Sequence, residues 1–159
     1  MKKIIRYFAM FVLISTLMLS FIIGGNFMSK SKAGLIENKR FIPCPNSPNC
    51  VSSMADKDDQ EHYIEPISYN NISEKDVYSR IIEILKNSQR CRIVTKRDNY
   101  IHAEFKSKIF RFTDDIEFLF PEGQSIIHVR STSRVGYSDM GVNRKRMMNI
   151  KALFKEVQP

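Results

Sequence analysis

The sequence predicts an α+β fold, in which an antiparallel sheet of about five or six strands is packed on one face by two helices. Two observations predict it. Between residues 91 and 134, apolar and polar residues alternate in short runs separated by turn residues, which is typical of antiparallel strands with one buried face. On either side of this block, at 77–85 and from 142 to about 156, apolar residues recur at helical spacing.

Each element follows from its own pattern. A short strand at 62–67 is limited by Pro66, which cannot donate to a strand ladder. Ser73 is a helix cap, with Asp76 three residues further on, and residues 86–88 end this helix. Strands are predicted at 91–96, 100–106, 109–113, 116–120 and 126–134, with Ile116, Phe118, Phe120, Ile127 and Val129 facing the core.

The N-terminal segment differs from the rest of the chain. A run of 19 uncharged residues, Tyr7–Gly25, follows three basic residues. A signal peptide has an apolar region of about 7–15 residues and a membrane span needs about 20, so the run favours an uncleaved signal-anchor. Small residues at 31–33 keep the alternative of a cleaved signal peptide open. The chain therefore divides into a signal-anchor or signal peptide at 1–25, a basic tether at 26–40 and a single α+β domain at 41–159.

The net charge is +8, but its position argues against nucleic-acid binding. Seven basic residues and one acidic residue lie within residues 1–40, which leaves 18 basic and 16 acidic residues for the domain. Most of the excess therefore flanks the apolar run, where positive charge sets membrane topology. A nucleic-acid-binding domain would carry the excess on its folded surface. We expect the membrane as a partner through the N-terminal segment, and no nucleic acid.

Cys44 and Cys50 enclose a loop with two prolines and two asparagines, a composition that forces turns. The turns bring the two cysteines within reach of a disulfide, which we favour over free thiols. Their spacing to Cys91 and to the histidines matches no familiar zinc pattern, so we expect no metal and no cofactor. A disulfide and an export segment both place the domain outside the cytoplasm, either membrane-anchored or, after signal cleavage, secreted or periplasmic.

The sheet face away from the helices collects polar side chains, among them the secondary site candidates His102 and His128. Histidines beside carboxylates and arginines are able to act in general acid–base catalysis. Alternating polar residues are also what a solvated face of an antiparallel sheet carries, and this interpretation is the favoured one.

A second set of polar residues lies where the last strand meets the final helix, in a loop punctuated by Gly136 and Gly141. Backbone N–H groups converge at such a junction, which favours an anion site. Arginines in the first turns of a helix oppose its dipole unless a negative group answers them, and that group is either Asp139 or an anionic ligand. The candidate ligand-binding residues are Arg130, Arg134, Tyr137, Ser138, Asp139, Asn143, Arg144 and Arg146.

Three segments carry a family resemblance: Cys44-Pro-Asn-Ser-Pro-Asn-Cys-Val-Ser-Ser53, Phe112-Thr-Asp-Asp-Ile-Glu-Phe118, and the stretch from Arg130 to Arg146. Together they resemble the domain of unknown function 1499 family, from about residue 41 to 155. Thr113 departs from the pattern, in which a small apolar residue is expected. The family is found in bacterial envelope proteins and plastid relatives, so the resemblance implies an envelope setting, and it transfers no activity.

These observations favour a membrane-tethered extracytoplasmic domain that acts as a non-catalytic binding or interaction module, with an anion-binding Arg loop. The alternative is a hydrolase or transferase on an anionic envelope substrate, using His128 or His102 with the arginines. A third interpretation is an envelope assembly factor that uses the sheet face as its interface. Enzymatic activity is thus left open, and the expected partners besides the membrane are an anionic small molecule or an envelope protein.

Overall fold

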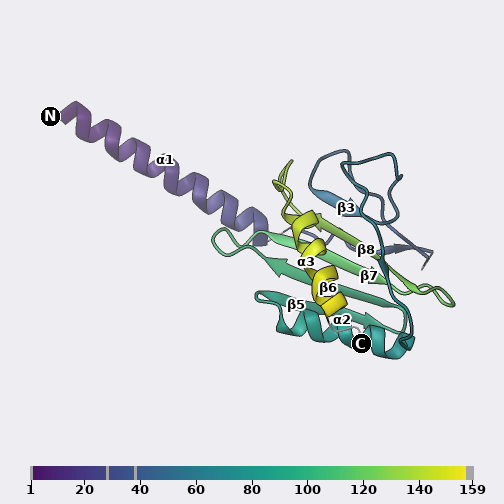
Figure 1. The fold of residues 1–159 in the computed structure, drawn as a ribbon. Helices are drawn as coiled ribbons and strands as arrows, with labels where there is room; N and C mark the ends of the chain where they lie inside the picture. The colour runs from purple at the N-terminus through teal and green to yellow at the C-terminus, as the bar shows by residue number, and fades with distance from the viewer. Residues whose placement is uncertain (1, 28, 38, 157–159) are drawn as a thin grey trace.

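The computed structural model describes residues 2–27, 29–37 and 39–156. Two helices cover one face of a sheet, and a long N-terminal helix projects away from this domain (Figure 1). Residues 1, 28, 38 and 157–159, which belong to the predicted anchor, tether and domain segments, lie outside the description. The architecture confirms the predicted α+β class, with an antiparallel sheet and two packed helices.

The sheet has six strands in the order β3-β8-β7-β6-β5, and β4 also pairs with β8. Their bounds are β3 Cys50–Ser52, β4 Ile67–Ser68, β5 Cys91–Arg97, β6 Tyr100–Lys106, β7 Thr113–Leu119 and β8 Ile126–Ser133. Neighbouring strands from β5 to β8 follow one another along the chain, so their connections alternate between the two ends of the sheet. Residues 88–90, 107–112 and 134–141 therefore lie at the same end, which we call the anchor end.

The two helices build the main core. α2 (Glu74–Asn87) begins as predicted at Ser73, whose Oγ accepts a hydrogen bond from the Asp76 N–H. α3 spans Val142–Glu156, also as predicted. The core that they form with the sheet includes the fully buried side chains of Val77, Ile81, Leu85, Ile101, Ile116, Phe118, Ile127, Val129, Met147 and Phe154. The expected inward-facing positions of the strands are thus confirmed, because side chains alternate between the two faces of a strand.

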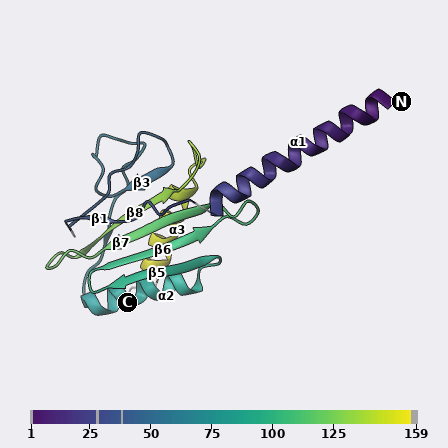
Figure 2. The same cartoon turned by 180° about the vertical axis from the view of Figure 1, so that it is seen from behind.

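The N-terminal helix α1 (Lys2–Phe27) precedes the domain. Its window Lys3–Ser20 has a mean hydropathy of 1.6 and none of it is buried against the domain. It is long and apolar enough to cross a membrane, a test that a signal sequence also passes. α1 joins the domain beside the loop between β6 and β7, as both views show (Figures 1 and 2).

The second face of the sheet is also covered. The chain that leaves α1 crosses it and forms a small two-stranded sheet of β1 (Leu35–Ile36) and β2 (Arg40–Phe41), seen from behind in Figure 2. Phe41 packs there in a small cluster with Tyr100 and Leu119. This covering was not expected, because residues 26–40 show no apolar periodicity.

One predicted strand, at 109–113, is a loop instead. The Ser107 N–H donates to the Phe112 carbonyl at 2.9 Å, and the Phe112 N–H donates to Ser107 Oγ at 2.9 Å. These bonds replace strand pairing, and Arg111 adopts a left-handed φ of 54°. β7 then begins only at Thr113 and continues without a break through residues 116–119.

The predicted strand at 62–67 is also mostly irregular. Only an isolated bridge between Ser52 and Tyr63 and the two residues of β4 pair with neighbouring strands. The N–H groups of His62 and Tyr63 instead donate to the Asp59 carbonyl, so a local turn takes up the backbone groups that a ladder would use.

Candidate functional site

The sheet face away from the helices carries a buried network of ion pairs. Arg130 is only 1% exposed and donates from Nη1 to Glu117 Oε2 at 2.6 Å. The Tyr100 hydroxyl donates to Oε1 of the same carboxylate at 2.7 Å. Arg130 and Glu117 lie directly opposite each other on β8 and β7, so the strand register itself creates the pair.

Asp115 is the centre of the rest of the network. Its carboxylate accepts from Arg134 Nη2 at 2.7 Å and Nε at 3.0 Å, and His102 Nε2 lies 2.8 Å from Oδ1. Arg134 also pairs with Glu104, which Arg92 reaches from β5 at 2.8 Å. The network therefore contains three carboxylates and three guanidinium groups, and a buried charge is tolerated only when it is paired in this way.

The electrostatics of the network hold its groups in one protonation state. Burial acts to raise the pKa of Asp115, but hydrogen bonds from His102 and Arg134 outweigh it, and the pKa lies well below its usual range. The same balance lowers the pKa of Glu104. Burial, reinforced by Glu117, raises the pKa of Tyr100. A general acid or base works best with a pKa near the operating pH, so these groups suit a structural role better than proton transfer.

The segment that follows α1 is hydrogen-bonded into the same network. Ser31 Oγ donates to Asp115 Oδ1 at 2.9 Å, and the Lys32 N–H donates to Oδ2 at 2.8 Å. The Gly34 N–H donates to Glu117 Oε1 at 2.8 Å. Each carboxylate oxygen can accept more than one hydrogen bond, so these donors add to the bonds that the arginines and Tyr100 already make.

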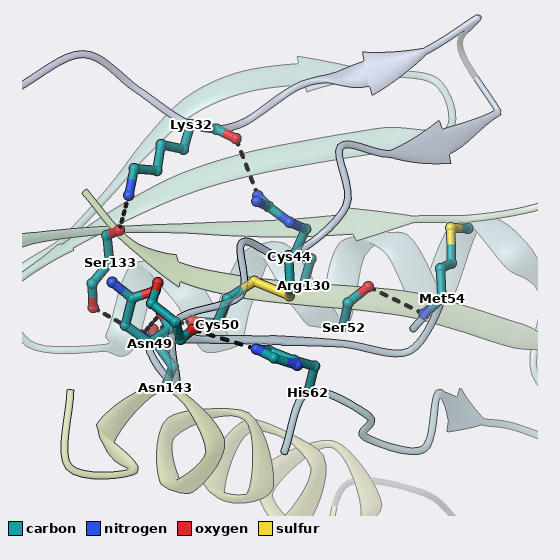
Figure 3. The surroundings of a disulfide bond; sticks show 12 residues. Lys32, Cys44, Asn49, Cys50, Ser52, Met54, His62, Arg130, Ser133 and Asn143 are labelled. Carbon is teal, nitrogen blue, oxygen red and sulfur yellow. Dashed lines mark hydrogen bonds between the residues drawn. A yellow bond between two sulfur atoms is a disulfide. The ribbon is translucent and has the colours of Figure 1, made fainter. Parts of the chain in front are cut away.

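Lys32 fastens this segment through both its backbone carbonyl and its side-chain amine. Its carbonyl accepts from Arg130 Nη1 at 3.1 Å, and its Nζ donates to the Ser133 carbonyl at 3.0 Å (Figure 3). The polar face was expected to be solvated, but the chain's own segment covers it. The predicted tether therefore contacts the domain over residues 29–34.

The loop of residues 44–50 is closed by a disulfide between Cys44 and Cys50, with a Cα–Cα distance of 5.6 Å, which confirms the predicted pairing (Figure 3). His62 supports this loop from one side. Its Nδ1 lies 2.7 Å from Asp59 Oδ2 and its Nε2 lies 3.3 Å from the Ser47 carbonyl. Because both ring nitrogens are engaged, His62 holds the loop in place through contacts with Asp59 and Ser47.

Asn143 joins the Cys loop to the last strand and the last helix. Its Nδ2 donates to the Asn49 carbonyl at 3.1 Å and to Ser133 Oγ at 3.0 Å, and its Oδ1 accepts from Ser131. Asn49 in turn donates to the Gly136 carbonyl at 2.6 Å. Asn143 is fully buried, so these bonds satisfy its amide and lock three segments together.

Asp139 caps α3. Its carboxylate accepts from the Gly141 N–H at 2.9 Å and from the Asn143 N–H at 2.7 Å. A negative side chain thus already answers the positive end of the helix dipole. An external anion at this helix end would have to displace it.

Arg144 and Arg146, on the first turns of α3, have separate partners. Arg144 donates to the backbone carbonyls of residues 60, 61 and 63 at 2.8–3.0 Å. Arg146 donates to Asp114 Oδ2 at 2.7 Å and lies over the Phe105 ring at 5.0 Å from its centroid. Each guanidinium fastens the helix to a different neighbour.

The arginines of the Arg loop, residues 134–146, therefore do not pair with Asp139, which was the expected alternative to an anionic ligand. Arg134 pairs with Asp115 and Glu104 and not with Asp139, because residue 134 continues the alternation of β8 onto the polar face. The cavity beside the loop has about 210 Å³, and Asp139, Glu61 and Arg144 are its charged lining residues. Two carboxylates against one engaged guanidinium disfavour an anion in that cavity, and the anion site stays a prediction.

The remaining candidates are dispersed. Tyr137 is 75% exposed and Ser138 lies beside it on the loop surface. His128 Nδ1 lies 3.1 Å from Ser53 Oγ, and burial lowers the pKa of this histidine. His102 and His128 thus have different partners, so the structure does not bring them together as one acid–base pair.

A second cavity of about 270 Å³ lies beside the Cys loop and is lined by His62, Asp59 and Met54, among others. Pockets for small molecules commonly have about 300–1,000 Å³, so this one falls just below that range. Among the residues that the structure describes, no group of three or more His, Cys, Asp or Glu side chains is placed to hold a metal ion.

Sequence reasoning missed two residues that are central to these contacts, Asp115 and Asn49. Asp115 stands two positions before Glu117 on the same face of β7, so the alternation of that strand was a signal for it. Asn49 carried no such signal, because only the fold brings the Cys loop beside the Arg loop.

The fold and these contacts define a class: a single α+β domain, locked by a disulfide and a buried ion-pair network, that follows an apolar N-terminal helix. The chain belongs to the family described as protein of unknown function (DUF1499), whose model matches residues 40–154. No curated protein and no solved structure matches the chain. The three motifs behind the family resemblance are the Cys loop, β7 and the Arg loop, which the contacts of Asn143, Asp115 and Arg134 join.

Proposed function

We propose that this chain is a membrane-anchored extracytoplasmic module that binds without catalysis, and that its binding surface includes the exposed part of the Arg loop. Its ligand is anionic, or is an envelope component that carries anionic groups. The docking of residues 29–34 on the sheet face supports the membrane-anchored part of this proposal. The exposed cations near the Arg loop support its anionic ligand.

That docking favours a retained anchor over a cleaved signal. Cleavage near residues 31–33 would remove Ser31 and Lys32, whose donors complete the hydrogen bonding of Asp115. A buried carboxylate that loses donors costs stability. The contacts of Ser31 and Lys32 therefore favour a mature protein in which α1 remains attached.

The disulfide supports the extracytoplasmic side of the membrane. Disulfides persist in oxidising compartments and are rare where glutathione and thioredoxin keep thiols reduced. The Cys44–Cys50 bond closes the loop to which Asn143 joins α3. An oxidising compartment therefore favours the folding of the whole Arg-loop region.

The pairing of the network supports binding over catalysis. Asp115, Glu117 and Arg130 are each at most 1% exposed and hydrogen-bonded to protein groups. Because the arginines are similarly committed, the anionic ligand would meet exposed cations near the loop, of which Lys145 on the first turn of α3 is the nearest in sequence.

The test compares melting temperatures of the full chain in phosphate and in chloride at equal ionic strength. We expect phosphate to raise the melting temperature of the wild type and to raise that of Lys145→Gln less. Lys155→Gln, at the far end of α3, is the matched control and should behave as wild type. An equal melting temperature in both salts would remove the anionic ligand from the proposal.

A further inference from the structure

We propose that the anchor end of the domain rests on the lipid surface, with the loops 107–112 and 134–141 in contact with anionic headgroups. This inference rests on the proposed function, since it needs α1 in the membrane, and it names the lipid headgroup as the source of the anion. Three separate observations support it: the position of this end, its exposed apolar side chains and its charge.

The position of the end is set by contacts just beyond α1. Arg134 Nη1 donates to the carbonyl of Ser29, two residues after the last residue of the helix. Lys32 Nζ donates to the carbonyl of Ser133, at the end of β8. The loop that begins at residue 134 is thus fastened within a few residues of the apolar helix, which leaves little length for the domain to stand away from the bilayer.

The loops at this end expose large apolar side chains. Ile109 is 79% exposed, Tyr137 75% and Met140 95%, and Phe110 beside Ile109 is 44% exposed. At the opposite end, the turns at 98–99 and 120–125 contain one large apolar residue, Phe120, which is 8% exposed. Among the loops at the two ends of strands β5 to β8, the exposed apolar side chains thus lie where the N-terminal helix meets the domain, while Ile36 of β1, 48% exposed, lies elsewhere. Aromatic and aliphatic tips of this kind insert at membrane interfaces.

Charge is polarised in the same direction. The three loops of the anchor end contain one acidic residue, Asp139, which caps α3, whereas Arg90, Lys108 and Arg111 are exposed there, with Lys30 and Lys106 adjoining. The turns at the opposite end contain two acidic residues, Asp98 and Glu122, and no basic one, although the exposed Lys96 and Arg97 adjoin them. The cationic excess is therefore on the anchor end. Cations flanking apolar tips match an anionic lipid surface, which attracts such residues electrostatically.

A lipid surface explains both features together. A protein partner would also accept apolar side chains, but it would not require them to lie at the end from which a membrane helix departs. The Ser107–Phe112 bonds close the loop 107–112, and Ile109, 79% exposed, projects from it.

The chain contains no tryptophan, so a single substitution gives an unambiguous fluorescent reporter. Ile109→Trp and Tyr137→Trp are made in the full chain and reconstituted in phosphatidylcholine vesicles with or without phosphatidylglycerol, the acyl chains being brominated to quench indole. Leu153→Trp is the matched control, since Leu153 is 45% exposed but lies near the opposite end of α3.

We expect brominated lipid to quench the two loop reporters more than the Leu153 reporter, and phosphatidylglycerol to increase that quenching. Lys108→Glu or Arg111→Glu, added to a loop reporter, should lower the ratio of lipid-bound to unbound loop at least about fivefold at low salt. This ratio is obtained from the quenching. Equal quenching at the three positions, which a protein partner at these loops would give, overturns the proposal, as does quenching that ignores phosphatidylglycerol. Retention in carbonate-washed membranes, measured on the same samples, tests the anchor separately.

Discussion

Arg134 on the end of β8 and Asp115 on β7 are joined by two hydrogen bonds, 2.7 Å from Nη2 and 3.0 Å from Nε, with Asp115 fully buried. This pair fixes the start of the Arg loop to the polar face of the sheet. It also places Asp115 where Ser31 and Lys32 complete its hydrogen bonding, so a single carboxylate connects the loop, the sheet and the segment after α1.

Asp115→Asn should destabilise the domain by about 2–4 kcal/mol, because Arg134 then keeps only Glu104, which it shares with Arg92, as its counter-charge. Urea unfolding of the full chain in detergent measures this. Asp98→Asn, at an exposed turn, is the control and should change the free energy of unfolding by less than about 0.5 kcal/mol. Equal stability of Asp115→Asn and wild type would show that the network contributes nothing.

Stability should fall as the pH is lowered through the acidic range. The pKa values of Asp115 and Glu104 are depressed in the folded state, so the unfolded chain takes up protons first as the pH drops. The stabilisation is therefore complete above the unfolded pKa of about 4 and is lost as the pH falls through the lower folded values. Unfolding free energies between pH 6 and pH 2 should follow this course, and Asp115→Asn should flatten it.

Arg146→Ala and Arg144→Ala should differ. Arg146→Ala leaves Asp114 largely buried without its partner and should cost about 2–4 kcal/mol. Arg144→Ala frees backbone carbonyls at a partly exposed site that water can reach, so about 1 kcal/mol is expected. Thermal unfolding compares the two, with Lys145→Ala as an exposed control. A larger loss of stability for Arg144→Ala than for Arg146→Ala would contradict this ranking of the two arginines.

The long strands β5 to β8, the Ser73 cap and the inward-facing residues were predictable because they depend on local periodicity, whereas the predicted strands at 62–67 and 109–113 were wrong. Ser73 and its partner Asp76 are three residues apart, and Ile116 and Phe118 follow the two-residue repeat of a strand. The same repeat placed Arg134 on the polar face. The expected alternative that Asp139 answers the arginines is not found, because proximity in the chain at a strand-to-helix junction does not say to which side each residue turns.

The covering of the polar face was not predictable from the sequence. Residues 29–34 bind largely through main-chain N–H and C=O groups, which every residue has, so their composition carries no signal. The pairing of Asn49 with Gly136 likewise spans distant segments. Local patterns therefore predicted the frame of the domain, while its polar contacts depend on which surfaces the fold brings together.

The thiols should divide into two kinds. Burial raises the pKa of Cys91 to about 11, so this thiol should react slowly with iodoacetamide at pH 8 in the folded protein and readily after denaturation. Cys44 and Cys50 should react only after reduction. Intact mass after alkylation counts the modified thiols. Rapid native modification of Cys91 would contradict its partly buried position against the core.

The membrane-anchored, extracytoplasmic state is tested most directly by the intact mass of the natively expressed protein in the carbonate-resistant membrane fraction. The predicted species retains the N-terminal helix and the docked Ser31 and Lys32, and is lighter than its reduced form by the two hydrogens of the Cys44–Cys50 disulfide. A soluble species that begins near Gly34, or a membrane species in which both cysteines are free thiols, would contradict the account.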